Sequence, residues 1–314
     1  MSPSLRLRNQ FYRSGQAICM GEESSHWREF KKQFRTELSD GHSPGRILGY
    51  GFGESDRRPS WLGHCLREVE IATKLFLLSQ RGLFWELLKA RRTVRKMGLF
   101  FSTDAFRHVC TMCLLKTKLT SPPGTVALIG DGPGIMGALI HETWPSARLI
   151  LIDLGATLAV QAQNLEKAYP KDFHVLAGGG GADAHFTYVP AENLGNLPAG
   201  EIDLAINVAS MQEMKSVSVQ KYFTILREKK TKVFYCCNRL EKIMPDGEVS
   251  RFMDYPWLTK DSHLVDEPCP WHNWFLGVSG KPAFRLGRLP VPLVRHYDGP
   301  HWHRLTELSC SMQK

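Results

Sequence analysis

The chain has 314 residues, of which 43% are hydrophobic and 23% are charged, a balance typical of a folded globular protein and not of a disordered one. The net charge of +9 is uneven: residues 1–120 hold 21 Lys and Arg against 11 Asp and Glu, and the remainder holds 19 against 20. This basic surplus indicates either a solvated helix face or an anionic partner. It is densest at Arg91, Arg92, Arg95 and Lys96.

Several classes of protein are excluded at this stage. No apolar run approaches the roughly 20 residues that cross a bilayer, so we expect no membrane span. Residues 1–15 are basic but lack the apolar stretch of a secretory signal, which favours a cytoplasmic location. Eight cysteines do not indicate a disulfide scaffold in a chain of this length. Cys110 and Cys113 form a CxxC inside a predicted helix, where buried thiols are favoured over half of a zinc site.

The first 120 residues predict a basic, mainly helical region. Residues 1–60 are rich in aromatic, basic and glycine residues, with a loop expected at 49–55. From Trp61 to about Lys118, apolar residues recur at three- and four-residue spacings, which predicts helices. The stretch TSPPG at 120–124 interrupts this pattern and marks a boundary, so we divide the chain into 1–120 and 121–314.

After this boundary, apolar strands alternate with amphipathic helices. Such alternation predicts an α/β fold with a doubly wound, Rossmann-like parallel sheet, whose loops gather at the carboxyl ends of the strands. The last 75 residues are expected to complete the sheet around 273–280 and 283–289 and to add a cap over the site. The predicted strands are 125–130, 147–153, 173–178, 201–210 and 232–238, and the predicted helices are 133–144, 157–169 and Met211 to about Glu228.

The stretch VALIGDGPGIMG, residues 126–137, carries a glycine turn where the first strand ends. Gly130, Gly132 and Gly134 let the backbone pass close to a ligand, and the following helix points its free N–H groups toward it. Asp153 ends the second strand, where a carboxylate can accept hydrogen bonds from both hydroxyls of an adenosine ribose. The sequence therefore predicts a cofactor that contains a nucleoside.

Two cofactor classes compete for this turn. Residues 132–137 formally match the GxGxxG of dinucleotide-binding proteins, so a nicotinamide oxidoreductase stays open. The GxGxG that starts at Gly130 fits the end of the strand better, and this form is typical of S-adenosylmethionine enzymes. Some 120 residues precede the turn, whereas dinucleotide domains commonly begin near the N-terminus.

Three later stretches carry a resemblance to a known family. EIDLAINVASMQEM at 201–214, YFTILREKKTKVFYCCNRLEKIMPDG at 222–247 and DYPW at 254–257 resemble the sugar O-methyltransferase family, and the specific part covers about 122–257. The resemblance implies a class I methyltransferase that uses S-adenosyl-L-methionine. Its acceptor would be a hydroxyl of a sugar, glycan or sugar nucleotide, including an anionic one, with an acceptor-site insertion at about 239–270.

The resemblance also implies roles for single residues. For the cofactor, Gly130, Asp131, Gly132 and Gly134 would line the methionine end, Asp153 would hold the ribose, Asp183 would contact the adenine amine, and Asn207 would face the transferred methyl group. For the acceptor, the candidates are Gln212, Asn238, Arg239, Asp254, Tyr255 and Trp257.

A general base is not singled out, although a sugar hydroxyl needs one. Glu213 is one candidate, but it also completes a capping box with Ser210. A histidine of the late group, His263 or His272, is another. We expect no metal site, because His301 and His303 have no carboxylates at ligand spacing nearby. Arg239 could equally pair with Glu241, and the aromatic residues at 255–257 could equally pack in a loop core.

Other functions remain open. The basic first third raises a nucleic-acid methyltransferase acting on tRNA or rRNA, although the Asp/Asn-Pro-Pro-aromatic signature of base amino-methylation and an RNA-binding module are lacking. Leu128 stands where many methyltransferases carry an acidic residue, which keeps a non-catalytic, methyltransferase-like binding protein in view. A homo-oligomer is also left open.

Overall fold

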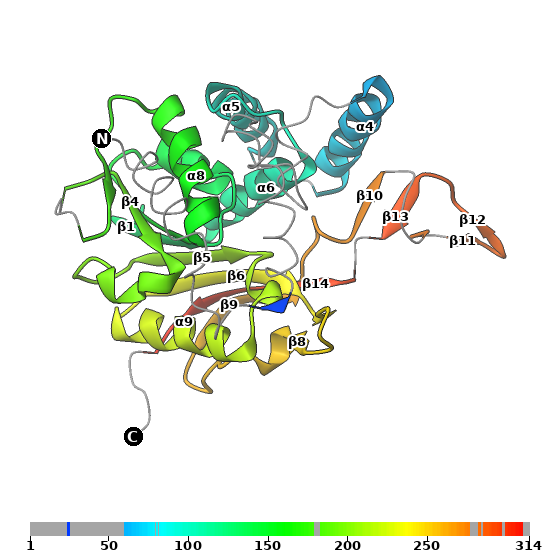
Figure 1. Cartoon of the computed structure of the whole chain (residues 1–314). Helices are drawn as coiled ribbons and strands as arrows, with labels where there is room; N and C mark the ends of the chain where they lie inside the picture. The colour runs from blue at the N-terminus through cyan, green and yellow to red at the C-terminus, as the bar shows by residue number, and fades with distance from the viewer. Residues whose placement is uncertain are drawn as a thin grey trace.

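The computed structural model describes residues 24–25, 60–78, 80, 82–178, 183–276, 282–283, 285–296 and 299–309; the loop expected at 49–55 lies outside them. Within these residues an eight-stranded sheet forms the centre, in the order β3-β4-β2-β1-β5-β6-β14-β9. Helices cover both of its faces, with α6 and α8 on one side and α9 on the other (Figure 1).

Between Trp61 and Lys118 the structure has three helices, as the apolar spacing predicted. They are α4 (Trp61–Leu78), α5 (Leu83–Lys96) and α6 (Thr103–Lys118). The side chain of Ser102 accepts a hydrogen bond from Ala105 N at the start of α6, and this N-cap sets where the helix begins. The apolar faces of α5 and α6 join one hydrophobic cluster with residues of the sheet. The helical region is therefore packed directly against the α/β part.

Five parallel strands form the middle of the sheet in the spatial order β4-β2-β1-β5-β6. Counted among themselves they run 3-2-1-4-5, the doubly wound order, which confirms the predicted Rossmann-like fold class. The chain reverses its winding between β1 and β5, so the glycine turn lies at the switch point. The strands are β1 (Thr125–Ile129), β2 (Arg148–Asp153), β4 (Phe186–Pro190), β5 (Leu204–Val208) and β6 (Val233–Arg239).

The crossover helices are α7 (Ile135–Thr143), α8 (Gly155–Ala168) and α9 (Ser216–Glu228). The first two agree with the prediction to within two residues. The third begins at Ser216 and not at Met211, because a single 3₁₀ turn, η2 (Met211–Glu213), ends in the extended residue Met214. The expected strand at 173–178 shrinks to the edge strand β3 (His174–Leu176), and β4 was missed altogether.

The C-terminal part completes the sheet with other residues than expected. β14 (His301–Glu307) runs antiparallel between β6 and β9 (Ser262–Pro268). The stretches predicted to do this form separate two-stranded pieces instead. These pieces are β10 (Trp274–Leu276) with β13 (Val294–His296), and β11 (Arg285–Leu286) with β12 (Leu289–Pro290).

The expected insertion at 239–270 is only partly an insertion. It contains the hairpin of β7 (Glu241–Ile243) and β8 (Val249–Arg251) and the short turn η3 (Phe252–Asp254). Its last part is β9, which belongs to the main sheet.

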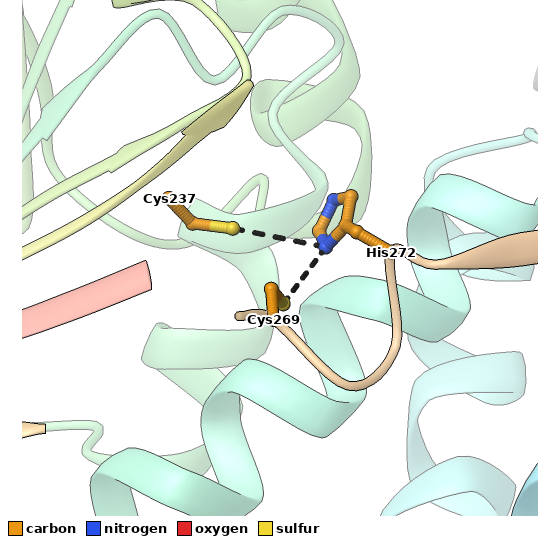
Figure 2. A group of neighbouring side chains, drawn as sticks. All are labelled: Cys237, Cys269 and His272. Atoms are coloured by element: carbon orange, nitrogen blue, oxygen red, sulfur yellow. Dashed lines mark hydrogen bonds between the residues drawn. The ribbon is translucent and has the colours of Figure 1, made fainter. Parts of the chain in front are cut away.

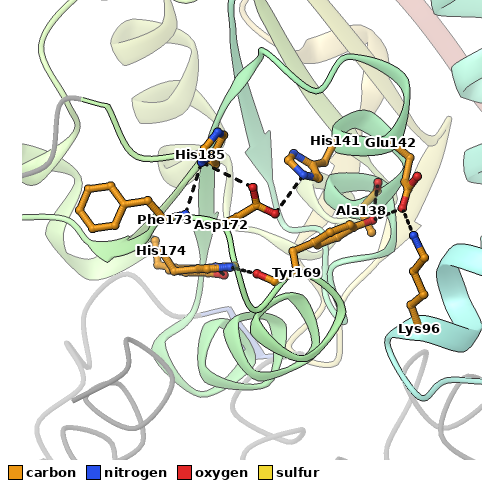
Figure 3. A network of polar contacts seen from close by, with 10 residues as sticks. Lys96, Ala138, His141, Glu142, Tyr169, Asp172, Phe173, His174 and His185 are labelled. Atoms are coloured by element: carbon orange, nitrogen blue, oxygen red, sulfur yellow. Dashed lines mark hydrogen bonds and ion pairs between the residues drawn. The ribbon is translucent and has the colours of Figure 1, made fainter.

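A histidine-rich network closes the amino end of β3 and β4 (Figure 3). Asp172 lies 3.3 Å from His141 Nε2 and 3.7 Å from His185 Nδ1, and His174 Nε2 lies 2.9 Å from the Tyr169 carbonyl. These contacts join the ends of α7 and α8 to the sheet. They belong to the amino edge, whereas the glycine turn opens at the carboxyl edge.

Two apolar clusters, one on each face of the sheet, form the core. Among the described helices, none has both the length and the apolar character needed to cross a membrane.

Candidate functional site

The glycine turn joins β1 to α7 with three residues in the left-handed region. The φ angles are 71° at Gly130, 60° at Gly132 and 90° at Gly134, which glycine adopts at little cost. A Cβ on Gly130 would overlap the side chain of Ser210, and one on Gly134 would lie 3.1 Å from Gln161 Cγ. At these two positions the close neighbour that demands glycine is therefore the protein itself.

Asp131 turns back onto the helix that follows it. Its carboxylate accepts hydrogen bonds from Met136 N at 2.9 Å and Gly137 N at 2.8 Å, so it occupies the N-terminus of α7. Burial raises the pKa of this carboxyl to about 7. The sequence assigned Asp131 to the methionine end of a cofactor and left the N–H groups of the helix free for a ligand. In the structure the side chain uses two of those groups.

Asp153 closes the carboxyl end of β2 against the same turn. Its Oδ2 accepts a hydrogen bond from Gly132 N at 3.0 Å, and its Oδ1 accepts one from Leu154 N at 2.8 Å. Burial, with a smaller contribution from the nearby Asp131 and Glu192, raises the pKa of Asp153 to about 7. The glycine turn and the predicted ribose-binding carboxylate are thus brought into direct contact.

Asp183 is not brought to this edge. It is exposed and precedes β4 by three residues, on the amino side of that strand. The prediction failed because β4 was not recognised, so Asp183 was taken to follow the third core strand. The acidic residue that does follow β4 is Glu192, whose Oε1 accepts a hydrogen bond from Gly155 N at 3.5 Å. The buried run FTYVP before it was the signal that could have identified it.

Asn207 braces the switch point from the end of β5. Its amide nitrogen donates to Ile129 O at 2.9 Å and to the hydroxyl of Ser210. Its oxygen accepts from Met211 N at 3.3 Å and from the Asn238 side chain at 2.8 Å. Both groups of this buried amide are therefore engaged within the protein, and its place beside a transferred methyl group stays a prediction.

Asn238 and Gln212 extend this network of internal hydrogen bonds to β6. The side-chain oxygen of Asn238 accepts from Gln212 N at 3.1 Å, and Gln212 Oε1 accepts from Arg239 N at 2.7 Å. Both side chains are buried, at 0% and 3% exposed. They hold η2 against the carboxyl edge, which is a different role from the acceptor contacts expected of them.

Glu213 is the last residue of η2, at the carboxyl edge. Its Oε1 accepts from Lys242 Nζ at 2.7 Å, and the pair is partly buried. The capping-box alternative is wrong, because Ser210 caps no backbone N–H of the turn and α9 begins only at Ser216. Glu213 therefore remains a side chain that faces the edge, held by a lysine. Arg239 ends β6 at the same edge.

The aromatic residues at 255–257 pack in the core. Tyr255 is 7% exposed, and the Trp257 ring lies 4.7 Å from Phe223 of α9 and 5.0 Å from the Arg304 guanidinium. This is the packing alternative, and it replaces the expected acceptor wall. Asp254, by contrast, is exposed.

His263 lies at the wrong edge for a base. It opens β9 and pairs in register with Thr306, whose hydroxyl lies 2.9 Å from its Nδ1. Because β9 runs parallel to β6, its first residues belong to the amino edge of the sheet. The late histidines were grouped by sequence position, and the strand direction separates them.

His272 lies at the carboxyl edge but is 1% exposed and faces two thiols (Figure 2). Its Nδ1 lies 3.1 Å from Cys269 Sγ and 3.7 Å from Cys237 Sγ. Burial, reinforced by the positive charge of Arg107, lowers the pKa of His272 well below its usual range, so the imidazole is neutral. The sequence treated Cys237 as ordinary packing and overlooked the Cys269-x-x-His272 spacing, the one signal for this cluster.

A scan against models of protein families finds no match to this chain, and a search of curated proteins also finds none. Among solved structures, the chain is similar to magnesium protoporphyrin IX methyltransferase from Synechocystis PCC 6803 with bound SAM, at 8% identity over 98% of each chain and a TM-score of 0.42. It is also similar to an RNA methyltransferase, so described provisionally, from Pyrococcus horikoshii, at 11% identity over 65% of this chain and 83% of that one, with a TM-score of 0.40. A third similarity is to precorrin-6y C5,15-methyltransferase from Geobacter metallireducens, at 10% identity over 62% and 87%, with a TM-score of 0.33. Similarities this distant carry no argument about function, and the sheet order itself establishes the fold class.

Proposed function

We propose that this protein binds S-adenosyl-L-methionine at the carboxyl edge of β1 and β2 and transfers its methyl group to a hydroxyl. The nucleoside part of the proposal rests on Asp153. Asp153 is a carboxylate at the end of β2, hydrogen-bonded to the glycine turn through Gly132 N, and such a group can accept hydrogen bonds from both ribose hydroxyls. Glu192 adds a second acidic group where the adenosine would lie.

The observation that carries the choice of cofactor is the carboxylate of Asp131. Dinucleotide-binding folds place a pyrophosphate on the N-terminus of the first crossover helix, where free N–H groups and the helix dipole favour negative charge. Here Asp131 already accepts from Met136 N and Gly137 N, so a pyrophosphate would meet a buried acid there. The sulfonium of S-adenosylmethionine carries no phosphate and a positive charge. Asp131 therefore repels the competitor and tolerates the proposed cofactor.

A second observation agrees with this choice. β14 runs antiparallel between β6 and β9, whereas the dinucleotide order continues with a parallel sixth strand.

The proposed acceptor is a sugar, a glycan or a sugar nucleotide, and it rests on the resemblance of residues 201–257. Glu213 and Arg239 end the neighbouring segments at this edge and are the side chains we assign to the acceptor side. Methyl transfer needs the acceptor oxygen near 3 Å from the methyl carbon, and positioning alone can supply roughly 7–11 kcal/mol. Glu213 would take the hydroxyl proton, and Lys242 would hold it in place.

The densest part of the basic region, at residues 91–96, supports the nucleic-acid alternative only through Arg92 and Arg95, which are exposed. Arg91 pairs with Glu68 and Lys96 with Glu142 at 2.7 Å. These pairs favour a solvated face with local partners.

Isothermal titration tests the cofactor, with S-adenosylmethionine and S-adenosylhomocysteine as ligands and NADH as comparator. We expect binding of the two sulfur ligands, a large loss in Asp153→Ala and no loss in Asp183→Ala, the exposed aspartate at the opposite edge. Binding of NADH alone, or equal binding by both variants and the wild type, would refute the cofactor assignment. Transfer of a labelled methyl group to sugar nucleotides, glycans or tRNA would then decide the acceptor.

A further inference from the structure

A second cluster of chemically reactive side chains lies on the same edge of the sheet, beyond β6 (Figure 2). Cys237 comes from β6, Cys269 directly follows β9, and His272 lies in the turn after it. One ligand atom from each residue, two Sγ and one Nδ1, lies within 4.8 Å of the others. All three residues are buried, at 0%, 2% and 1% exposed. The proposed methyl transfer uses none of them.

The spacing of these atoms fits a metal ion. A tetrahedral zinc with bonds of about 2.3 Å to sulfur and 2.0–2.1 Å to nitrogen separates the sulfur and nitrogen ligands by about 3.5 Å. The observed distances from His272 Nδ1 are 3.1 Å to Cys269 Sγ and 3.7 Å to Cys237 Sγ, on either side of this value. In Figure 2 both sulfur atoms point toward the same ring nitrogen.

The charge balance also suits zinc. Two thiolates and a neutral imidazole around Zn²⁺ sum to zero, whereas an isolated thiolate would be costly at this depth. Without an ion, the two thiols and the imidazole would occupy the same space, but no bond would use their approach to one ring nitrogen.

The surroundings hold the loop that carries Cys269 and His272 in place from two elements, β14 and α4. Cys269 N donates to His301 O at 2.8 Å, which ties the first ligand of the loop to β14. On the other side, Lys74 of α4 donates to Trp271 O at 3.3 Å and to Trp274 O at 2.7 Å. A metal here would therefore join β6, the loop at 269–274 and the N-terminal helices.

From this geometry we propose that Cys237, Cys269 and His272 bind one zinc ion, with His272 coordinating through Nδ1 and a water molecule as the fourth ligand. The ion clamps the loop at 269–274 to the end of β6. It thereby fixes the acceptor-side edge without taking part in methyl transfer.

The test is the zinc content of the full-length chain, purified without chelators and without a histidine tag, which would bind zinc itself. We expect about one zinc per chain in the wild type. Cys237→Ser, Cys269→Ser and His272→Ala should each lose it. Cys236→Ser is the matched control, because Cys236 is the buried neighbour that faces the other side of the sheet, and it should keep the metal.

A wild-type measurement keeps the proposal testable even if the variants fold poorly. Replacing zinc by Co²⁺ should give the charge-transfer absorption of cobalt–thiolate bonds, and a thiol-modifying reagent should release the metal. A wild-type chain free of zinc, zinc retained by all three ligand variants, or a Cys237–Cys269 disulfide in the intact mass would each overturn the proposal. Cofactor titration in Asp153→Ala is a separate measurement, so failure of one proposal does not imply failure of the other.

Discussion

The two ends of the carboxyl edge differ in how they are built. At β1 and β2, the glycine turn and its two carboxylates come from one short stretch, Gly130 to Asp153, and Ser210 packs against this turn from the segment after β5. At β6 and β9, Cys237 meets a loop more than thirty residues away, and α4 reaches that loop from the other end of the chain. The first end is defined mainly by local backbone geometry, and the second is defined by tertiary contacts alone. Substitutions at the two ends should therefore fail in different ways.

The largest effect is expected at the second end, from Lys74→Met. Lys74 is 2% exposed and pairs with buried Glu70 at 2.8 Å, while Glu70 accepts from Leu276 N at 3.0 Å. Removing the lysine leaves a buried carboxylate without its cation, which typically costs about 3–5 kcal/mol. Denaturant unfolding should show this loss, and the zinc content should fall with it because the carbonyl contacts to the loop disappear.

Two controls separate the pair from general damage. The double variant Glu70→Gln, Lys74→Met should recover much of the loss, since no uncompensated charge remains. Lys89→Met removes an exposed partner of Glu86 and should change the unfolding free energy by less than about 1 kcal/mol. If Lys74→Met were as mild as Lys89→Met, the loop would not depend on α4.

The next effect belongs to the first end, in Gly130→Ala. The φ of 71° is costly for alanine by roughly 1–2 kcal/mol, and the new methyl group would overlap Ser210, which adds about 1–3 kcal/mol. We expect a loss of stability of about 2–5 kcal/mol and weaker cofactor binding, with the zinc content unchanged.

Gly155→Ala is the matched control, because a Cβ there meets nothing within 4 Å and the residue is the first of α8. It should leave stability unchanged or slightly raise it. Adding Ser210→Gly to Gly130→Ala should relieve the overlap but also removes the Ser210 hydroxyl that Asn207 contacts, so Ser210→Gly alone is measured beside it. Loss of zinc in Gly130→Ala would show that the two ends are coupled.

These two sites also show which features of the fold and of the candidate site could be predicted from the sequence. The glycine turn and Asp153 were recognised because glycine spacing and strand ends are local properties, and the doubly wound order follows from alternation. The corrections share one cause. The roles of Asp183, His263 and the residues hydrogen-bonded around Asn207 were assigned from their position along the chain. Strand direction and pairing, however, decide which edge of the sheet a residue reaches. Cys237 and His272 could not be paired at all without the register of β6, β14 and β9.

A moderate effect is expected from pH on the cofactor site alone. Because burial raises the pKa of Asp153 from 3.8 to about 7, its carboxylate should be mostly protonated at pH 6 and mostly ionised at pH 8. Only the ionised form accepts from both ribose hydroxyls, so S-adenosylhomocysteine affinity should fall about tenfold from pH 8 to pH 6. Titration calorimetry across this range measures it, and Asp153→Asn should bind weakly with a flat profile.

The same raised pKa of Asp153 has the opposite effect on the stability of the protein without cofactor. Above pH 3.8 the folded state holds a proton that the unfolded state releases, so this group's contribution to stability declines as pH rises toward about 7. Cofactor binding and unligated stability should therefore move in opposite directions over this window. Asp131→Asn serves as a comparison, because Asp131 titrates in the same range but contacts α7. If this variant abolished the pH dependence of binding, Asp131 would be the titrating group.

The smallest effect is expected far from both ends, in Lys96→Met on the basic helix α5. Lys96 is half exposed and lies 2.7 Å from Glu142, which also contacts the Tyr169 hydroxyl in the network of Figure 3. Exposed pairs of this kind contribute about 0–1 kcal/mol, so unfolding, cofactor affinity and zinc content should all stay close to wild type. Filter binding with tRNA at two salt concentrations completes the comparison. If tRNA binding is sensitive to salt and is weakened by Lys96→Met, the basic face of α5 has a nucleic-acid partner. The ion pairs with Glu68 and Glu142 would then describe that face only in the absence of nucleic acid.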